Sequence, residues 1–398
     1  MEAAQKAQSP VIVQLGHGEG KFLLGEGIGD SQATTMEPVP PHKAATAGAI
    51  ALAMHVRSVA GYYGIPVVLH TDHCARNLLP WFEGMLAADE EYFARNGEPL
   101  FSSHMLDLSA EPDEENIATC VEYFKRLQPM KIWLEVEIGI TGGEEDGVNN
   151  EDVDTDKLYT TSKQVWSVYE ALSKVGPMFS IAVAFGNVHG VYRPGDVTLA
   201  PEKLGTHQAY AKAMLGNTNN TNNSYNDSSN SSNDLNNPLY LVMHGGSGSS
   251  DDEINLAVSH GVIKMNINTD TQWAYWDGLR GYEKNRRAYL QDQIGNPGGN
   301  DRPNKQFYDP RVWIRKAEES MVKRVMVSMD KLSTTGTYDI AAAQKNGNGK
   351  SETAYGQIGL ETPRPGPILI MAAGAVLGSA ATLLLSAIFS RNSQTNAK

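Results

Sequence analysis

Three histidines and one aspartate stand where metal chemistry would need them. Thr71-Asp72-His73 follows an apolar run, so a metal ligand and a carboxylate lie within a few ångströms of each other. His189 and His244 also follow apolar runs, and each is followed by glycine. One such histidine is more often an ordinary core residue, but three neutral imidazoles with one open position form the ligand set of a catalytic zinc. The pattern favours a metal-dependent enzyme.

An acidic, glycine-flanked segment adds a candidate base. Gly142-Gly143-Glu144-Glu145-Asp146-Gly147 follows an apolar run that contains Glu137. The glycines predict a mobile loop, and three adjacent acids make a poor core segment. A solvated acidic loop is the simpler interpretation. The nearness of Glu137 favours instead a lid that brings a carboxylate base into the site.

A glycine-rich turn could bind phosphate. Gly245-Gly246-Ser247-Gly248 leads into a predicted helix, Asp251–Ser259. A helix N-terminus offers unpaired N–H groups and a positive dipole end to an anion. The segment Lys264–Asp270 could supply the other wall. Arg311, in Asp309-Pro310-Arg311, could reach a second phosphate, although a lone arginine is more often a surface charge.

Repeated strand and helix signals must position these groups. Helical spacing occurs at Ala44–Tyr63, Glu114–Leu127 and Ser162–Ser173, and alternation of strand with helix predicts a parallel α/β sheet. The strands are expected where apolar, β-branched runs suit burial on both faces. Seven such runs occur, at Pro10–Leu15, Ile65–Asp72, Leu100–Leu106, Lys131–Gly139, Met178–Gly186, Leu239–Gly246 and Val262–Asp270.

Seven strands would suit an open doubly wound sheet, but the polar residues favour a (β/α)8 TIM barrel. A barrel enzyme draws its chemistry from the carboxyl ends of many strands, whereas an open sheet concentrates it at one switch point. Polar side chains end almost every run: His70 and Asp72, His104 and Asp107, Glu135 and Glu137, Asn187 and His189, His244, and Asn266 with Asn268. Only the short helical stretch Glu2–Gln8 precedes the first run. The barrel is therefore expected to lack its first strand and most of its first helix, unless the true start lies upstream of Met1.

Seven segments carry a resemblance to a known family: VVLHTDHCARNLLPW, LFSSHMLDLS, LEVEIGITGGEEDGV, FGNVHGVYRPG, HGGSGS, KMNINTDTQWAYW and YDPRVWIR. Together they resemble class II, zinc-dependent fructose-bisphosphate aldolases, over roughly Pro10 to Leu332. The GGEEDG loop and the Asn-Pro-Gly-Gly…Asp-Pro-Arg segment resemble the dimeric branch that cleaves fructose bisphosphate more than the tagatose-type relatives. The resemblance implies a homodimer that binds sugar phosphates in glycolysis, gluconeogenesis or carbon fixation.

The resemblance also implies a role for each matching position in reversible cleavage of D-fructose 1,6-bisphosphate to dihydroxyacetone phosphate and D-glyceraldehyde 3-phosphate. Asp72 would exchange the proton of the C4 hydroxyl, and Glu145 would take the proton from the dihydroxyacetone phosphate carbon. The metal residues would be His73, His189 and His244 for zinc, with Asp107 and Glu137 marking a second or alternative position. The substrate-binding residues would be Gly190, Gly245, Ser247, Asn266 and Asn268, with a monovalent cation (K⁺ or Na⁺), and Arg311 for the glyceraldehyde phosphate.

Some positions depart from the family pattern. Gly16-His17-Gly18-Glu19 stands where a serine and paired glycines are usual, and Glu19 would place a negative charge near the phosphate. Asn268 stands where aspartate is usual. With the missing strand, these departures leave open a catalytically impaired pseudoenzyme acting as a membrane-tethered binding module. A metal-dependent hydrolase is a further alternative, but it does not explain the glycine-rich phosphate loop.

Composition and organisation complete the expectations. The net charge of −13 argues against a nucleic-acid partner, and two cysteines without a Cys-x-x-Cys pair indicate a reducing compartment, with Cys74 a buried structural thiol. The start, MEAAQKAQSP, shows no targeting peptide. An aldolase domain is expected at 1–332, with an Asn/Ser-rich insertion at 217–237, a flexible linker at 333–367 and a polar tail at 390–398.

An uncharged run of 22 residues, Ile368–Phe389, precedes that polar tail. A helix of this length would span ~33 Å, enough for the ~30 Å core of a bilayer. The alternative is a buried C-terminal helix of the barrel. Because the linker separates the run from the domain, a tail anchor with the enzyme facing the cytosol is the prediction.

Overall fold

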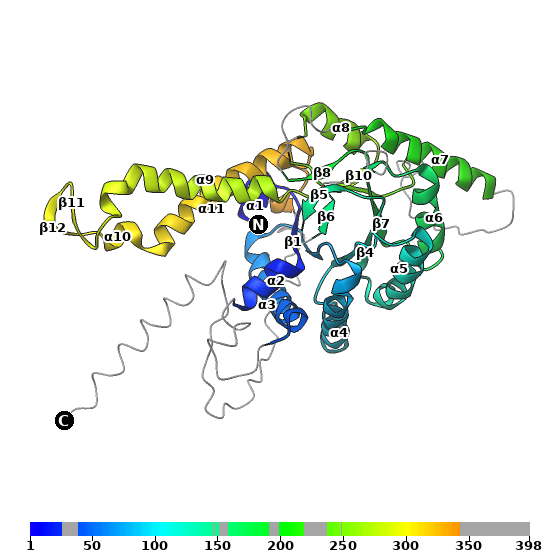
Figure 1. Ribbon diagram of the computed structural model, residues 1–398, viewed down its shortest axis with the longest axis horizontal. Coiled ribbons are helices and arrows are strands. Elements are labelled where there is room, and N and C mark those ends of the chain that lie inside the picture. The colour runs from blue at the N-terminus through cyan, green and yellow to red at the C-terminus, as the bar shows by residue number, and fades with distance from the viewer. Residues whose placement is uncertain are drawn as a thin grey trace, which may run out of the picture.

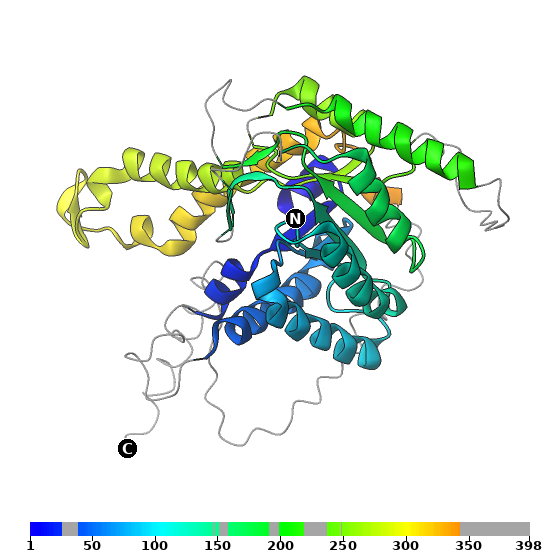
Figure 2. The same cartoon turned by 45° about the vertical axis from the view of Figure 1, so that its right-hand side comes forward.

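The computed structural model describes residues 1–25, 39–145, 148–150, 158–190, 199–218, 237–247 and 249–342. Seven strands form one curled parallel sheet in sequential order, β1-β2-β3-β4-β7-β9-β10 (Figures 1 and 2). They are β1 (Val11–Leu15), β2 (Val67–Thr71), β3 (Ser103–Leu106), β4 (Trp133–Ile138), β7 (Phe179–Val183), β9 (Leu241–Met243) and β10 (Val262–Met265). Each lies within one of the predicted runs, and every neighbouring pair is parallel.

Helices cover the outer face of this sheet (Figure 1). They are α3 (Pro41–Tyr63), α4 (Leu79–Asn96), α5 (Asp113–Leu127), α6 (Ser162–Leu172), α7 (Glu202–Thr218) and α8 (Asp251–Ser259). α5 shows why they form: three acids occupy its first turn and two bases its last, which complements the helix dipole. Shorter helical pieces are α1 (Glu2–Ala7), α2 (His17–Leu24) and three 3₁₀ turns at Arg76–Leu78, Gln128–Met130 and Arg287–Tyr289.

The apolar core lies between the sheet and these helices. Phe82, Phe101, Phe124 and Phe185 are fully buried there, packed with many aliphatic residues. The central strands β3, β7 and β9 are buried on both faces, and the inner face of the sheet carries polar side chains that contact one another. The core thus holds the strands rigidly around a polar interior, where the site lies.

The two edge strands of the sheet are β1 and β10. Among the described residues, no strand pairs with the outer edge of either one. Both edges expose aliphatic side chains, Ile12 at 38% and Ile263 at 53%, whereas the four residues of β3 are all buried. The sheet is therefore a curled half-barrel with a gap between β1 and β10.

The acidic segment predicted as a loop begins as a strand. β5 (Gly142–Glu145) pairs antiparallel with β6 (Val148–Asn150) and parallel with β8 (Val188–His189). The mobile-loop prediction missed this pairing because β8 comes more than 40 positions later in the chain. As a result, the backbone before the acidic residues lies beside His189.

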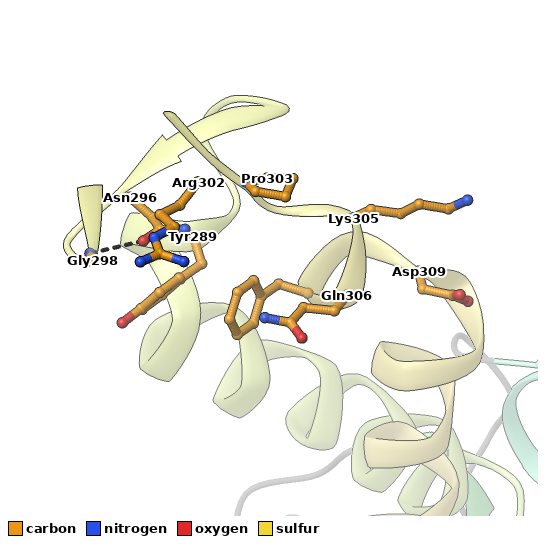
Figure 3. A pocket seen from close by; sticks show the side chains of 9 residues that line it. Tyr289, Asn296, Gly298, Arg302, Pro303, Lys305, Gln306 and Asp309 are labelled. Atoms are coloured by element: carbon orange, nitrogen blue, oxygen red, sulfur yellow. Dashed lines mark hydrogen bonds between the residues drawn. The ribbon is translucent and has the colours of Figure 1, made fainter. Parts of the chain in front are cut away.

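A long arm was not predicted. α9 (Thr269–Arg286) and α11 (Pro310–Lys331) pack side by side and extend away from the sheet, with α10 (Lys305–Tyr308) and the hairpin of β11 (Ile294–Asn296) and β12 (Gly299–Pro303) at the far end (Figure 1). The strand predicted over Val262–Asp270 therefore ends at Met265, and its last residues begin α9. The arm tip holds an open pocket of about 760 Å³, lined by residues that include Tyr289, Arg302 and Lys305 (Figure 3).

The N-terminal helix α1 packs along α11. Ala4 and Ala7 pack with Met329, and Arg315 forms an ion pair with Glu2. Beyond α11, the first residues of the predicted linker hydrogen-bond to this region: the N–H of Gly336 donates to the carbonyl of Ala7 at 2.8 Å.

Residues 219–236 of the Asn/Ser insertion predicted at 217–237, most of the linker and the candidate membrane helix Ile368–Phe389 lie outside the described residues. Within the described parts of the chain, no helix combines the length and apolar character needed to cross a bilayer.

Candidate active site

The three predicted imidazoles meet although the strands that carry them are not neighbours in the sheet order. His73 follows β2, His189 ends β8 and His244 follows β9, and their ring centroids lie 4.7–5.9 Å apart. One ligand nitrogen from each falls within 4.8 Å of the others, and all three residues are buried or nearly so. The backbone of His73 has a φ of +40°, a strained conformation of the kind that surrounding structure maintains at functional sites.

The distances between ring nitrogens and their neighbours show which nitrogens face a shared ion. His244 Nδ1 lies 3.0 Å from His73 Nε2, while His73 Nδ1 lies 3.2 Å from Asp107 Oδ2. His73 Nε2 and His244 Nδ1 therefore point into one place, with a carboxylate behind His73. A buried oxygen nearby, Glu137 Oε2, has no hydrogen-bond donor among the described residues. Imidazole nitrogens with carboxylate oxygens in support fit a divalent zinc ion.

Asp107 and Glu137 form a second group with His73 whose ligand atoms lie within 4.8 Å of one another. Burial opposes ionisation of Asp107, but the hydrogen bond from His73 lowers its pKa to about 2. Burial and the adjacent Asp107 raise the pKa of Glu137 well above its usual value. Two buried carboxyls this close repel each other unless a cation or proton lies between them, so the pair suits the predicted second metal position.

Asp72 is held as a carboxylate beside the imidazoles. Gln14 Nε2 donates to its Oδ2 at 2.9 Å, and Asn266 Nδ2 contacts both oxygens at 3.1 Å. Burial opposes its charge, but the neighbouring His73 and His70 keep the pKa of Asp72 well below its usual value. Gln14 was not among the predicted site residues. Its register opposite His70 comes from the pairing of β1 with β2, which no local sequence signal indicates.

Beneath Asp72 lies a second layer of buried polar groups. Side chains on one face of a strand repeat every two residues, so His70, Glu135 and Lys264 fall one layer below Asp72, Glu137 and Asn266. Lys264 Nζ contacts Glu135 Oε2 at 2.9 Å and His70 Nε2 at 3.2 Å. The segment Lys264–Asp270 was predicted to form one wall of the phosphate site. Lys264 does not face that site, because its ammonium is directed into the interior ion pair.

The candidate phosphate residues come from adjoining loops. An added Cβ on Gly245 would lie 2.4 Å from the carbonyl oxygen of Val188, so the loops before Gly190 and after His244 touch. Ser247 Oγ accepts from the N–H of Asp270 at 3.4 Å, which joins the glycine-rich turn to the start of α9.

The helix predicted after this turn is α8, with the predicted bounds, but its start is already capped. Ser250 and Glu253 already cap α8, so part of its first turn is used. Asn268 is the N-cap of α9 and makes no side-chain cap. In α9, the N–H of Asp270 donates to Ser247, so each of the two helix starts has one first-turn N–H already in use.

The departure at Glu19 has a local explanation. Its carboxylate accepts the N–H of Gly16 at 2.9 Å and so caps its own helix α2. His17 lies against the rings of His42 and Trp81. The negative charge of Glu19, which was expected near the phosphate, therefore lies at the N-terminus of α2.

Arg311 is not assembled with the other predicted residues, and the side chain of Glu145 lies outside the described residues. Arg311 begins α11 at the far end of the arm, where it forms an ion pair with Asp309 at 2.6 Å (Figure 1). The backbone of Glu145 lies in β5, next to the strand that bears His189, but its side chain is outside the described residues.

Buried imidazoles and carboxylates at the open end of a parallel sheet are the arrangement of a TIM-barrel-like α/β enzyme. The model of the fructose-bisphosphate aldolase class II family matches residues 1–337, and the chain belongs to that family. The resemblance predicted from the sequence is confirmed.

Relatives are similar over most of their length. The fructose-bisphosphate aldolase of Candida albicans is 52% identical over 336 residues, which is 84% of this chain and 87% of the relative. That of Saccharomyces cerevisiae is 50% identical over 337 residues, covering 85% and 87%. The crystal structure of the aldolase of Campylobacter jejuni matches with 48% identity and a TM-score of 0.69, covering 84% of this chain and 86% of that one.

Proposed function

We propose that the chain catalyses the reversible aldol cleavage of D-fructose 1,6-bisphosphate to dihydroxyacetone phosphate and D-glyceraldehyde 3-phosphate. The observation that carries the proposal is the convergence of three buried imidazoles on one place beside the Asp72 carboxylate. Relatives named as fructose-bisphosphate aldolases at about half identity support it. The pseudoenzyme alternative finds no support, because the described metal ligands and Asp72 are assembled together.

His73, His189 and His244 would hold the zinc ion. When bound there, zinc supplies Lewis-acid polarisation of the substrate ketone and balances the enediolate charge, so the reaction needs no Schiff-base lysine. Asp72 takes the proton of the C4 hydroxyl in cleavage and returns it in condensation. Gln14 and Asn266 orient the Asp72 carboxylate for that transfer, because each donates to its oxygens.

The remaining assignments concern proton transfer at the ketose and phosphate binding. Glu145 would exchange the proton of the dihydroxyacetone phosphate carbon, carried on β5 beside His189. The ketose phosphate would lie between the glycine-rich turn and the start of α9, with a K⁺ or Na⁺ ion nearby. The residues there are Gly190, Gly245, Ser247, Asn266 and Asn268.

Chelation tests the function directly. Exhaustive dialysis against EDTA should abolish cleavage of fructose 1,6-bisphosphate, and zinc should restore it. Borohydride added with substrate should leave the activity intact, because no imine forms on the enzyme. An Asp72→Asn variant should bind zinc but cleave poorly. Full activity after exhaustive chelation would rule the mechanism out.

Arg311 fits the substrate site only if a second copy of the chain delivers it. Its place at the arm tip, with Asp309, is far from the imidazoles of its own chain (Figure 1). A homodimer in which each arm reaches the other site would resolve this. Mixing Arg311→Ala chains with Asp72→Asn chains should then regain activity, because one site of each mixed dimer combines an intact Asp72 with an intact Arg311. Mixed, subunit-exchanged chains that gain nothing would refute this arrangement.

The curled sheet would be a (β/α)8 barrel with the place of one strand between β1 and β10. The exposed Ile12 and Ile263 on these two edges support this, since a strand there would cover both. A chain extended upstream by a strand and a helix should unfold at a higher temperature than this chain. Equal unfolding temperatures would count against the proposal.

A further inference from the structure

The two nitrogens of His244 have different surroundings. Nδ1 faces the shared metal position, 3.0 Å from His73 Nε2. Nε2 lies 2.8 Å from Glu135 Oε1. A carboxylate oxygen at this distance accepts a hydrogen bond, so the ring proton is on Nε2 and the lone pair of Nδ1 is left for a metal.

Glu135 is held in turn by a lysine. Both side chains are almost fully buried, with 1% of Glu135 and 8% of Lys264 exposed. Lys264 Nζ donates to both carboxylate oxygens, at 3.0 Å to Oε1 and 2.9 Å to Oε2. The ammonium also lies 3.2 Å from His70 Nε2, and His70 Nδ1 contacts Ser103 Oγ at 2.7 Å.

This ammonium occupies a place that would otherwise suit a cation. His70, Asp72 and Glu135 offer ligand atoms within 4.8 Å of one another. Lys264 places its own positive charge against two of the three, His70 and Glu135. The lower layer is therefore neutralised by the protein itself, and Glu135 remains free of any role as a direct metal ligand.

We propose that Lys264 and Glu135 are a positioning pair that fixes the tautomer of His244, so that Nδ1 presents its lone pair to the metal. The inference rests on the proposed zinc site and adds two residues that act through His244. Lysine has only donors, so it demands an acceptor from its partner. Glu135 satisfies Lys264 and His244 together, because a carboxylate only accepts.

An amide cannot satisfy both neighbours. In Glu135→Gln, the side-chain oxygen must turn to the Lys264 ammonium, which places the NH₂ group against His244 Nε2. His244 must then accept at Nε2 and carry its proton on Nδ1, where it blocks the metal. If Lys264 is also removed, the amide can turn back and offer its oxygen to His244. The amide is therefore expected to weaken zinc binding only when Lys264 is present.

The experiment measures zinc affinity by competition with a chromophoric chelator, in the full chain and without substrate. Glu135→Gln should raise the zinc Kd about 10–100-fold, the usual cost of losing such an outer partner. The double variant Glu135→Gln/Lys264→Met should bind close to wild type. Lys264→Met alone should also bind zinc with nearly wild-type affinity, because Glu135 still accepts from His244. Glu83→Gln is the matched control, since it removes the carboxylate of an exposed pair with Arg126 on the outer helices.

Three outcomes overturn the inference: a zinc Kd for Glu135→Gln within about threefold of wild type, a double variant as weak as Glu135→Gln, or an equal loss in Glu83→Gln. A merely structural role would make the double variant at least as weak as the single one. If Glu135→Gln does not fold, Glu135→Leu/Lys264→Met replaces it. That variant should bind zinc at least about tenfold more weakly than Glu135→Gln/Lys264→Met, and equal affinities refute the pair.

The wild-type measurement separates this inference from the proposed function. A wild-type chain that binds no zinc overturns both. A wild-type chain that binds zinc and cleaves fructose 1,6-bisphosphate, with unaltered affinity in Glu135→Gln, overturns only the positioning pair.

Discussion

Gly245 is the position where one added methyl group should damage the site most. Its φ is +63°, in the left-handed region that disfavours residues with a Cβ. A Cβ there would also lie 2.4 Å from the carbonyl oxygen of Val188 and 2.7 Å from its carbonyl carbon. Both atoms belong to backbone, so no side chain can rotate away to make room.

The geometry sets the size of the effect of Gly245→Ala. Restoring an ordinary contact of 3.4 Å requires a movement of about 1 Å between the two loops. Val188 directly precedes His189, so the shift is carried to a proposed zinc ligand. A displacement of about 1 Å in a catalytic site can cost about 100-fold in rate, or ~2.7 kcal/mol. The left-handed backbone adds about 1–2 kcal/mol of instability.

Three measurements on Gly245→Ala test this reasoning: kcat/KM for fructose 1,6-bisphosphate, zinc Kd and the unfolding temperature. Gly97→Ala separates out the backbone cost, because Gly97 has a φ of +75° but nothing within 4 Å of an added Cβ. It should lose about 1–2 kcal/mol of stability with unchanged zinc affinity. Gly246→Ala should be milder in all three, because the two atoms nearest its Cβ are Cγ and Sδ of the Met265 side chain, and the backbone oxygen of Asn266 lies farther away at 3.3 Å. Wild-type kinetics in Gly245→Ala would refute the argument.

Three more predictions concern other parts of the chain. Asp107→Asn should weaken zinc binding about 10–100-fold, measured by chelator competition, because His73 Nδ1 loses a charged partner; unchanged affinity would show that Asp107 does not support the metal. Glu2→Gln should lower stability at neutral pH by less than ~1 kcal/mol, since it breaks a partly exposed pair with Arg315. The Arg315 hydrogen bond lowers the pKa of Glu2 to about 2, so the stabilisation is present above its usual value of 4.5 and should vanish as the pH falls towards 2; a difference in melting temperature that persists at pH 2 would contradict this. In cell fractionation, the tail run Ile368–Phe389 predicts retention in membranes through a high-salt wash and release by detergent, and release by salt alone would defeat the anchor.

The sequence was enough to predict the strands of the sheet and the nearness of the three histidines, because both leave local signals. Burial on two faces produces continuous apolar runs, and all seven matched strands. His73, His189 and His244 could be grouped because parallel strands deliver their carboxyl ends to one edge. Helix α8 was predicted with its observed bounds, since Ser250 before it and Glu253 within it are a capping signal.

Features that depend on distant partners could not be predicted in this way. Gln14 reads as an ordinary polar residue until β1 is seen beside Asp72. Lys264 lies near the phosphate segment in sequence, but its ammonium donates to the carboxylate of Glu135 on β4, 129 positions away. The arm was missed because α9 and α11 face each other only after the chain has turned through the hairpin between them.

Because both natural cysteines are buried, a cysteine introduced elsewhere on the chain could be labelled selectively. Cys74 and Cys120 are fully enclosed, and burial raises the pKa of each thiol. Alkylating reagents should therefore leave the native protein unmarked. A cysteine introduced in place of an exposed arm residue such as Lys305 would then be selectively labelled. Spin or fluorescent probes attached there could measure how far apart two arms lie in solution, without first removing either natural cysteine.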